Sequence, residues 1–271
     1  MPKVCLDAGH YGRYNRSPGV SAYYESECMW KLCQLLATAL QQRGIAVVHT
    51  RTNPAVDLAL TSRGRASSGC DLFVSLHSNA VGSGMNESVD YPLAVVMLNG
   101  STDKIGKSLA DCVAKVVGTK QKGKTTTKAG STGGEYYGVL RGAAAVGVPG
   151  LILEHSFHTN TKAANWLLSD SNLAKLAEAE ADCIASHLQK KKPVKQEAPK
   201  QEAAKPATFK SYLVKITAST LNVRAGAGTH YKINTVVQKG GVYTIVDEAN
   251  GWGKLKSGAG WIKLSYTQKL R

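Results

Sequence analysis

Residues 150–158, GLILEHSFH, are an apolar run that leads directly into a glutamate, Glu154. The residues before this glutamate have the composition of a buried strand. A carboxylate at the edge of an apolar core is energetically costly unless another group compensates its charge. The usual compensating groups are an Arg or Lys, a set of hydrogen bonds, or a metal ion. The rest of the chain must supply one of these.

Segments typical of strands and helices alternate on either side of this run, through residues 1–188. Residues 25–44, ESECMWKLCQLLATALQQRG, place apolar side chains on one face of a helix and end at a glycine. Such alternation predicts an α/β fold, a three-layer sandwich with helices on both faces of a mostly parallel, mixed sheet. The expected strands are residues 3–10, 45–51, 71–80, 93–99 and 150–157, and the further expected helices are residues 101–118, 161–170, 172–189 and a segment that ends near Ser68.

Two histidines and two glutamates lie where expected strands end or a helix begins: His10, His77, Glu154 and Glu25. The carboxyl ends of parallel strands meet at one edge of a sheet, so these side chains can converge there. Two histidines and a carboxylate on zinc, with a second carboxylate to carry protons, form a common hydrolytic site. The four residues are 15, 52 and 77 positions apart, however, and no local motif such as HExxH occurs. Spacing alone therefore also allows two histidines at the core edge and two surface glutamates.

The composition changes at residues 189–209, QKKKPVKQEAPKQEAAKPATF. This segment is too polar to fold and its prolines stiffen it, so we expect a linker. It separates a first domain, residues 1–188, from a second, residues 210–271. The second domain has short β-branched runs broken by glycine at close intervals, which predicts a small all-β barrel.

The basic charge is concentrated after the first domain. The chain has a formal net charge of +15, but residues 1–188 contribute only +3, from 18 basic and 15 acidic side chains. Residues 210–271 hold ten Lys or Arg and two Asp or Glu. A basic module joined to a nearly neutral one suggests an anionic partner for the small domain only, either nucleic acid or an anionic wall polymer.

The cysteines and the distribution of apolar residues bear on where in the cell the protein is made. The six cysteines are scattered and form no CxxC pair, so we expect reduced, mostly buried thiols. No apolar stretch approaches the roughly 18 residues of a membrane helix. The first residues, MPKVCLDAGH, do not resemble a signal peptide. We therefore expect synthesis in the bacterial cytosol, no membrane partner, and release by another route if the protein acts outside.

Four segments of the first domain, taken in order, resemble the zinc-dependent N-acetylmuramoyl-L-alanine amidases of the amidase 3 family. They are VCLDAGHYG, YYESECMWKLCQLLATALQQRGIAVVHTRT, RASSGCDLFVSLHSNA and GVLRGAAAVGVPGLILEHSFHTN. The resemblance implies an α/β sandwich with one catalytic Zn²⁺. Matched position by position, it implies His10, Glu25 and His77 as metal ligands and Glu154 as the catalytic carboxylate. The implied reaction cleaves the amide between N-acetylmuramic acid and L-alanine in peptidoglycan.

Three features depart from the family pattern. The loop at residues 11–24 carries arginines and tyrosines where many members are rich in Gly and Asp. Residues 81–92, VGSGMNESVDYP, form a long loop beside His77, and His155 replaces the usual glycine after the catalytic glutamate. We expect these differences to alter substrate contacts and to leave the chemistry intact.

The second domain resembles a bacterial SH3 domain, in the segments STLNVRAGAGTHYKI and NGWGKLKSGAGWIKL. The resemblance implies a small barrel that binds the cell wall, so the expected partners are peptidoglycan and wall polymer, with no nucleic acid. An amidase, a charged linker and a wall-binding module without a signal peptide match the layout of a phage endolysin. Such enzymes reach the wall from the host cytosol through a holin pore.

For several other polar residues near these positions, the sequence suggests a supporting role or a place outside the site. Strand alternation places His155 on the face opposite Glu154, away from a metal. His158 and Asn79 can line the site, and Asp7 can hold a ligand histidine in place. Arg51 is expected to hold a carboxylate or a backbone carbonyl.

Other functions agree with parts of the sequence. A zinc peptidase of similar fold would cut within the stem peptide, although no segment marks a pocket for a free carboxylate. A wall-binding protein with an inactive enzyme domain would not need the complete set of four site residues. A nucleic-acid-binding protein would use the basic charge, but no DNA- or RNA-binding motif fits. A bacterial autolysin would share the chemistry of a phage lysin.

Overall fold

The computed structural model of the chain describes residues 1–190, 211–229, 231–249 and 251–270. The described residues form two compact units, one within residues 1–194 and the other within residues 195–271. The helix that closes the first unit, α6 (Asp170–Lys190), runs two residues beyond the predicted end of the first domain. The rest of the predicted linker up to Phe209 lies outside the described residues.

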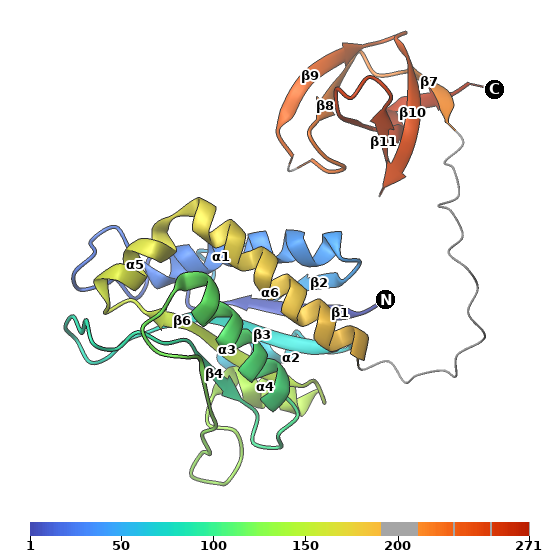
Figure 1. The fold of residues 1–271 in the computed structure, drawn as a ribbon. Coiled ribbons are helices and arrows are strands. Elements are labelled where there is room, and N and C mark those ends of the chain that lie inside the picture. Colours follow the sequence, from blue (N-terminus) through green and yellow to red (C-terminus); the bar gives the residue numbers. More distant parts are fainter. Residues whose placement is uncertain (191–210, 230, 250, 271) are drawn as a thin grey trace, which may run out of the picture. The chain divides into compact units, whose positions relative to one another are not determined.

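A six-stranded mixed sheet forms the middle layer of the first unit (Figure 1). Its strand order is β2-β1-β3-β6-β4-β5. The first four strands of that order are parallel, and β4 is antiparallel to β6. The strands are β1 (Lys3–Ala8), β2 (Ala46–His49), β3 (Leu72–Asn79), β4 (Leu93–Val96), β5 (Lys124–Thr126) and β6 (Gly150–Phe157).

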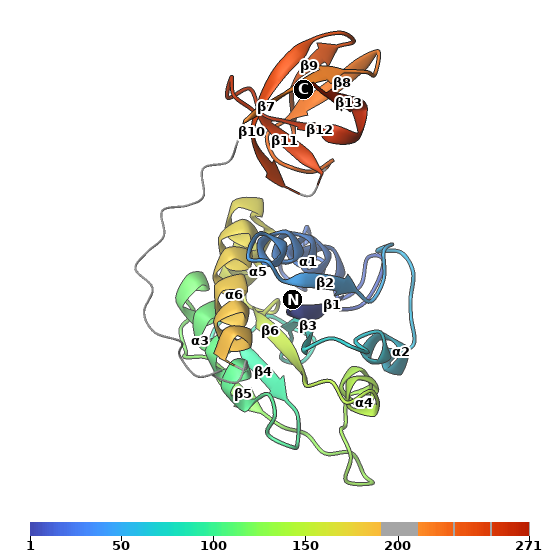
Figure 2. The same cartoon turned by 90° about the vertical axis from the view of Figure 1, so that its right-hand side faces the viewer.

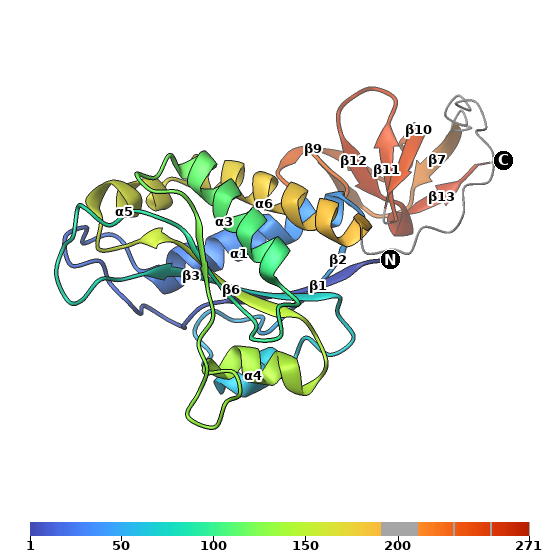
Figure 3. The same cartoon turned by 60° about the horizontal axis from the view of Figure 1, so that its bottom comes forward.

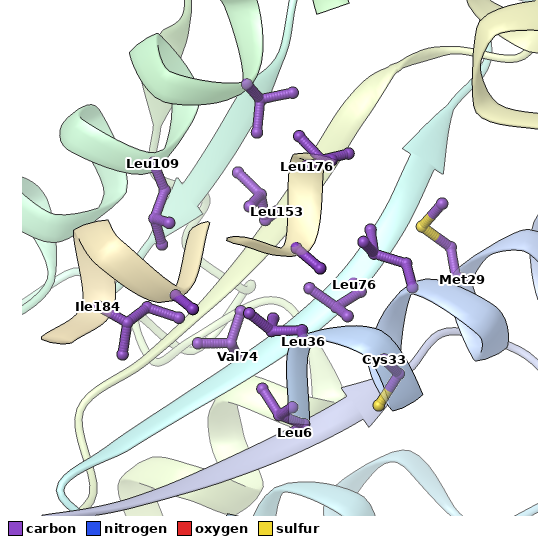
Figure 4. Packing of buried hydrophobic residues seen from close by; sticks show 14 of the residues in the cluster. Leu6, Met29, Cys33, Leu36, Val74, Leu76, Leu109, Leu153, Leu176 and Ile184 are labelled. Atoms are coloured by element: carbon purple, nitrogen blue, oxygen red, sulfur yellow. The ribbon is translucent and has the colours of Figure 1, made fainter. Parts of the chain in front are cut away.

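Helices cover both faces of this sheet (Figure 3). One face is covered by α1 (Glu25–Gln42), α3 (Asp103–Val117), α5 (Thr161–Leu168) and α6, and the other by α2 (Leu60–Arg65) and α4 (Gly138–Ala145). Figure 4 shows the larger core, where Leu6, Leu76 and Leu153 of the sheet meet Leu36 of α1 and Ile184 of α6. This arrangement confirms the predicted α/β sandwich.

Several elements differ from the sequence prediction. Strands β3 and β6 match the expected ranges within one residue, but β1 ends at Ala8 and β4 at Val96, before the expected residues 10 and 99. Helix α2 ends at Arg65, before the expected Ser68. Neither α4 nor β5 was expected, and β5 is three exposed residues that pair with β4 at the sheet edge.

The second unit is an antiparallel sheet of seven strands (Figure 2). Its core contains Val223, Ile245 and Ile262, all fully buried. Such a small all-β unit agrees with the predicted barrel. Its elements are β7 (Tyr212–Ile216), β8 (Thr220–Arg224), β9 (Ile233–Gln238), β10 (Val242–Ala249), β11 (Trp252–Leu255), β12 (Trp261–Lys263), the 3-10 helix η1 (Leu264–Tyr266) and β13 (Thr267–Lys269).

The cysteines agree with the free thiols expected from the sequence. All six cysteines are free, and four of them are buried. Within the described residues, no helix combines the length and apolar character needed to cross a membrane.

Candidate active site

Three of the predicted site residues meet beyond the carboxyl ends of β1 and β3. His10 follows β1, His77 lies near the end of β3, and Glu25 is the first residue of α1. One candidate ligand atom from each lies within 4.8 Å of the other two. Nδ1 of His77 is 2.9 Å from Oε1 of Glu25, and Nε2 of His10 is 3.3 Å from Oε2. Two imidazoles and a carboxylate at this spacing are a donor set that suits Zn²⁺.

The charges of this cluster are strongly coupled. Burial by itself raises the pKa of the Glu25 carboxyl, but hydrogen bonds and charge from His10 and His77 outweigh burial and hold that pKa well below its usual range. For His77 burial lowers the pKa, and the contact with Glu25 more than reverses this, which raises the pKa to about 9. In the metal-free protein a proton on His77 therefore balances the buried carboxylate, at a position where a cation can bind.

Two buried arginines hold the backbone that carries His10. Nη2 of Arg51 donates to the carbonyl of Ala8 at 2.6 Å, as expected for a structural arginine. Arg63 donates to the carbonyls of Ala8 and His10 at 3.3 and 3.2 Å. His10 has a φ of 57°, in the left-handed region that costs a non-glycine residue free energy. The two guanidinium groups thus stabilise a strained backbone that aims His10 at the cluster.

Asn15 connects the loop after β1 to the same cluster. Its Nδ2 donates to Oε2 of Glu25 at 2.7 Å and lies 3.1 Å from Nε2 of His10. Asn15 has a φ of 53°, which asparagine tolerates better than most residues. Its carbonyl also accepts the backbone N–H of Glu25 at 3.0 Å. Asn15 therefore orients Glu25 through both its side chain and its backbone.

Gly9 makes room for His77. A Cβ at position 9 would lie 2.4 Å from Cε1 of the His77 ring, closer than real contacts allow. The backbone N–H of Gly9 donates to the carbonyl of Leu76 at 2.9 Å, which ties β1 to β3 beside the ring. Only glycine permits this approach of the backbone to the imidazole.

Glu154 is the direct neighbour of His77 across the β3–β6 ladder. Paired residues of a parallel ladder point to the same face, so both side chains face the site. Oε2 of Glu154 is buried and has no hydrogen-bond partner among the described residues. Burial raises the pKa of this carboxyl to about 7, the charge of Glu25 adds to this, and His77 opposes it. The glutamate that ends the apolar run is therefore a carboxyl poised to exchange a proton near neutral pH.

His155 lies on the opposite face of β6, as strand alternation predicts. Its Nε2 is 2.7 Å from Oε1 of Glu180 on α6, and its Nδ1 is 2.8 Å from the carbonyl of His77. Both side chains of this pair are fully buried. Burial lowers the pKa of His155, but the charge and hydrogen bond of Glu180 outweigh it and raise the pKa. The pair supports the strand that carries His77 and is not part of the cluster of His10, Glu25 and His77.

His158 is buried beside Glu25 and does not lie on an exposed surface of the site. It is 5% exposed, and its Nδ1 is 3.0 Å from Oγ of Ser78 and 3.9 Å from Oε2 of Glu25. The hydroxyl of Tyr23 donates to the same Oγ at 2.7 Å, and its ring stacks on the ring of His158. These side chains form a buried polar chain that supports Glu25.

One secondary interpretation, that for Asp7, does not match the contacts observed, and that for Asn79 stays a prediction. Asp7 does not hold a ligand histidine: its carboxylate accepts from Thr50 and Ser75 at 2.6 and 2.7 Å. Oδ1 of Asn79 accepts the backbone N–H of Ala80, a local turn contact. The carboxylate of Asp7 therefore makes its hydrogen bonds away from His10, Glu25 and His77.

Sequence reasoning did not identify Asn15, Arg63 or Glu180. Arg63 and Glu180 lie on helices, and Asn15 lies in a loop. Each forms a hydrogen bond to a residue at or beside the site that belongs to another element of the fold. The sequence contained one indication of the role of Glu180. It is a charged residue between apolar positions of α6, and a charge at a buried position needs a partner.

The first unit has the fold of solved N-acetylmuramoyl-L-alanine amidases. It is similar to the catalytic domain of CwlV from Bacillus (Paenibacillus) polymyxa var. colistinus, with 21% identity and a TM-score of 0.59, over 70% of this chain and 99% of that one. An amidase from Clostridium difficile 630 is similar at 21% identity and a TM-score of 0.60, over 70% of this chain and 98% of that one. At these identities the likeness defines the class of fold.

The family follows from the sequence match. Residues 4–186 match the N-acetylmuramoyl-L-alanine amidase family, and residues 219–268 match the bacterial SH3 domain. Because the first match spans most of the chain, this protein belongs to the N-acetylmuramoyl-L-alanine amidase family. Relatives include an endolysin of Bacillus phage SPP1, 30% identical over 78% of this chain and 74% of that protein. The amidase CwlM of Bacillus licheniformis is 26% identical over 68% of each chain.

Proposed function

We propose that this protein is a zinc-dependent amidase of peptidoglycan, with His10, Glu25 and His77 as the metal ligands and Glu154 as the catalytic carboxylate. The observation that carries the proposal is the buried, unpartnered Oε2 of Glu154 in direct register with His77. A carboxyl with a pKa near 7 can accept and return a proton at physiological pH.

The residues divide the chemistry between them. Zn²⁺, when bound, supplies Lewis acidity toward the amide carbonyl and makes water more acidic. Oε2 of Glu154 takes the proton from the attacking water and delivers it to the leaving nitrogen of L-alanine. The carbonyl carbon gains a C–O bond and loses its C–N bond, which leaves a carboxylate on the muramic acid and a free amine on the peptide. Asn15 keeps Glu25 oriented through the reaction.

The second domain supports the choice of substrate. Its match to a bacterial SH3 domain and its ten basic side chains favour attachment to an anionic cell wall. The similarity to a phage endolysin supports a lytic role, with release from the host cytosol through a holin pore. A cell's own autolysin is the second candidate, because a bacterial amidase is also among the relatives.

The test is digestion of purified Gram-positive peptidoglycan with analysis of the soluble products. New L-alanine amino groups without new reducing sugar ends are expected, and they should disappear with a chelator and return with Zn²⁺. New amino groups inside the stem peptide would instead establish a peptidase. Activity that persists in metal-free protein would contradict the zinc assignment.

Substitution of the catalytic carboxylate provides the matched test. Glu154→Gln should bind Zn²⁺ normally and lose amidase activity by about 10²–10⁴-fold, the usual contribution of a general base. The control is Glu27→Gln, because Glu27 is a partly exposed glutamate near Glu25 that pairs with Arg13 at 2.9 Å. Near-normal activity of Glu154→Gln would remove Glu154 from the mechanism.

A further inference from the structure

Two exposed tyrosines, Tyr14 and Tyr11, stack in succession on His10, one of the candidate metal ligands. The ring of Tyr14 stacks on His10 with centroids 5.1 Å apart and planes 17° apart. The ring of Tyr11 stacks on Tyr14 in turn, at 6.1 Å and 21°. Tyr11 is 39% exposed and Tyr14 is 50% exposed. The stack therefore begins at a candidate metal ligand, and the parts of Tyr11 and Tyr14 that it leaves exposed form an aromatic surface that faces solvent.

The backbone that carries this aromatic surface is held in place. The backbone N–H of Tyr14 donates to Oγ of Ser26 at 2.8 Å, and the hydroxyl of Ser26 donates to the carbonyl of Gly12 at the same distance. The N–H of Gly12 donates to the carbonyl of Pro54 at 2.8 Å. These bonds tie the loop to the first turn of α1, which also supplies Glu25. The rings are thus preorganised relative to the metal cluster, and binding to them costs little ordering entropy.

The charged side chains of the same loop are occupied elsewhere. Arg13 pairs with Glu27 at 2.9 Å and lies 4.2 Å over the ring of Tyr24. Arg16 donates to the carbonyl of Ser21 at 3.1 Å. The aromatic surface therefore suits a neutral ligand with an apolar face better than the carboxylates of a stem peptide.

We propose that Tyr11 and Tyr14 form a subsite for the sugar ring of N-acetylmuramic acid, on the glycan side of the scissile amide. This inference rests on the proposed amidase function, since that substrate carries a sugar on one side of the bond and a peptide on the other. A sugar ring presents C–H groups on its faces and hydroxyls at its edges, so it can cover the tyrosine rings while its hydroxyls stay hydrated. Tyrosine supplies rigid, amphipathic contact area for such binding.

The subsite would act on substrate recognition. Contacts with a part of the substrate that does not react are made equally in the ground state and in the transition state, so they lower KM and leave kcat unchanged. Tyr11 lies one ring further from His10 than Tyr14 does, so its removal leaves the metal cluster untouched. Tyr11→Ala is therefore the cleaner variant, and Tyr11→Phe keeps the stacking ring.

The experiment measures ligand binding in full-length Glu154→Gln protein, in which turnover of a probe that carries an amide should be about 10²–10⁴-fold slower. One probe is the disaccharide of N-acetylglucosamine and N-acetylmuramic acid with its lactyl carboxyl capped as a methylamide, so that it is neutral. The free stem peptide is the other, and each is titrated by NMR or calorimetry. Tyr11→Ala should weaken disaccharide binding about five- to tenfold and leave peptide binding unchanged, whereas Tyr11→Phe should stay within about twofold.

The control is Tyr136→Ala. Tyr136 is 47% exposed, but it lies in the segment before α4, which leads into the start of β6 rather than its carboxyl end. Disaccharide binding that is undetectable, that is unchanged in Tyr11→Ala, or that falls equally in Tyr136→Ala would overturn the inference. Loss of peptide binding in Tyr11→Ala would reassign the tyrosines to the peptide side and overturn it as well.

Failure of the proposed subsite can be distinguished from failure of the proposed amidase function. Disaccharide binding through Tyr11 without release of L-alanine amines by the wild-type protein would contradict only the amidase proposal. In active enzyme, Tyr11→Ala should raise KM for a soluble disaccharide-peptide about five- to tenfold with kcat within about twofold. A fall in kcat with KM unchanged would overturn the subsite.

Discussion

At the scale of single residues, the properties that suit Glu154 for catalysis oppose stability. Its carboxyl has an unpartnered, buried oxygen, and its pKa is raised to about 7. A neighbouring carboxylate, Glu25, adds to this rise. Functional sites commonly retain such destabilising groups because the chemistry depends on them.

The first prediction concerns the stability of metal-free Glu154→Gln as a function of pH. The carboxyl pKa is about 7 in the folded protein against 4.5 unfolded, so the folded state binds more protons between these values. Stability of the wild type should fall as pH rises from 4.5 to 7, and the variant should lack this fall. At pH 8 the variant should be more stable by about 2 kcal/mol, after allowance for solvent screening. Urea unfolding with chelator at pH 5 and pH 8 measures this, and equal gains at both values would contradict it.

The second prediction concerns Gly9→Ala. The new methyl group would overlap the His77 ring, so the imidazole must move or the strand must shift. We expect a loss of about 1–3 kcal/mol in the free energy of unfolding and weaker Zn²⁺ binding. Gly84→Ala is the control, because a Cβ there meets nothing within 4 Å. Unchanged Zn²⁺ affinity in Gly9→Ala, measured by competition with a chelating dye, would argue against His77 as a ligand.

At the scale of elements, the site depends on contacts that join strands to helices on both faces. Helix α2 supplies Arg63 to the end of β1, and helix α6 supplies Glu180 to β6. Helices α2 and α4 pack backbone to backbone, since a Cβ at Gly64 would lie 2.0 Å from the carbonyl oxygen of Val139. Each layer of the sandwich thus contributes to the position of the metal cluster.

The third prediction concerns the buried pair of β6 and α6. Glu180→Gln should lower the free energy of unfolding by about 3–5 kcal/mol, because it leaves His155 without its charged partner in the core. Glu178→Gln removes a neighbouring glutamate that pairs with Arg43 at the surface, and should cost less than about 1 kcal/mol. Chemical denaturation of the two variants compares them directly. Similar losses in both would mean that the buried pair adds no more than a surface pair.

At the scale of the whole molecule, catalysis and charge are divided between two units. The first unit contains the complete candidate site, and residues 1–188 are nearly neutral, with 18 basic and 15 acidic side chains. The second unit matches a separate domain family, and its described residues have the larger net positive charge, from 8 basic and 2 acidic side chains against 19 and 15 in the first. Salt should therefore affect wall binding and hydrolysis differently.

The fourth prediction is that salt separates these two steps in the full-length protein. Raising NaCl from 0.05 to 0.5 M should weaken binding to intact walls severalfold, because added salt screens attraction between surface charges. Hydrolysis of a soluble disaccharide-peptide should change by less than about twofold. Walls stripped of anionic polymer serve as the control and should show little salt dependence. Equal salt sensitivity of soluble and wall-bound substrates would place the effect in the catalytic unit.

The sequence by itself determined the alternation of strands and helices and the two-domain organisation. Through resemblance to a family, it also predicted His10, Glu25, His77 and Glu154 as the site residues. Hydrophobic periodicity is local, so the long segments were predictable from a few neighbouring residues. The existence of β5 was not, because pairing with the distant strand β4 decides it.

Only the tertiary structure decided how the four side chains are held. Spacing alone left open a dispersed arrangement, and the fold brings three candidate ligand atoms within 4.8 Å of one another. No short sequence pattern relates the residues that support the site. Asn15 orients Glu25, Arg63 binds the backbone carbonyl of His10, and Gly9 lies close to the ring of His77. The physical reason is that packing and buried hydrogen bonds depend on which distant segments the completed sheet places side by side.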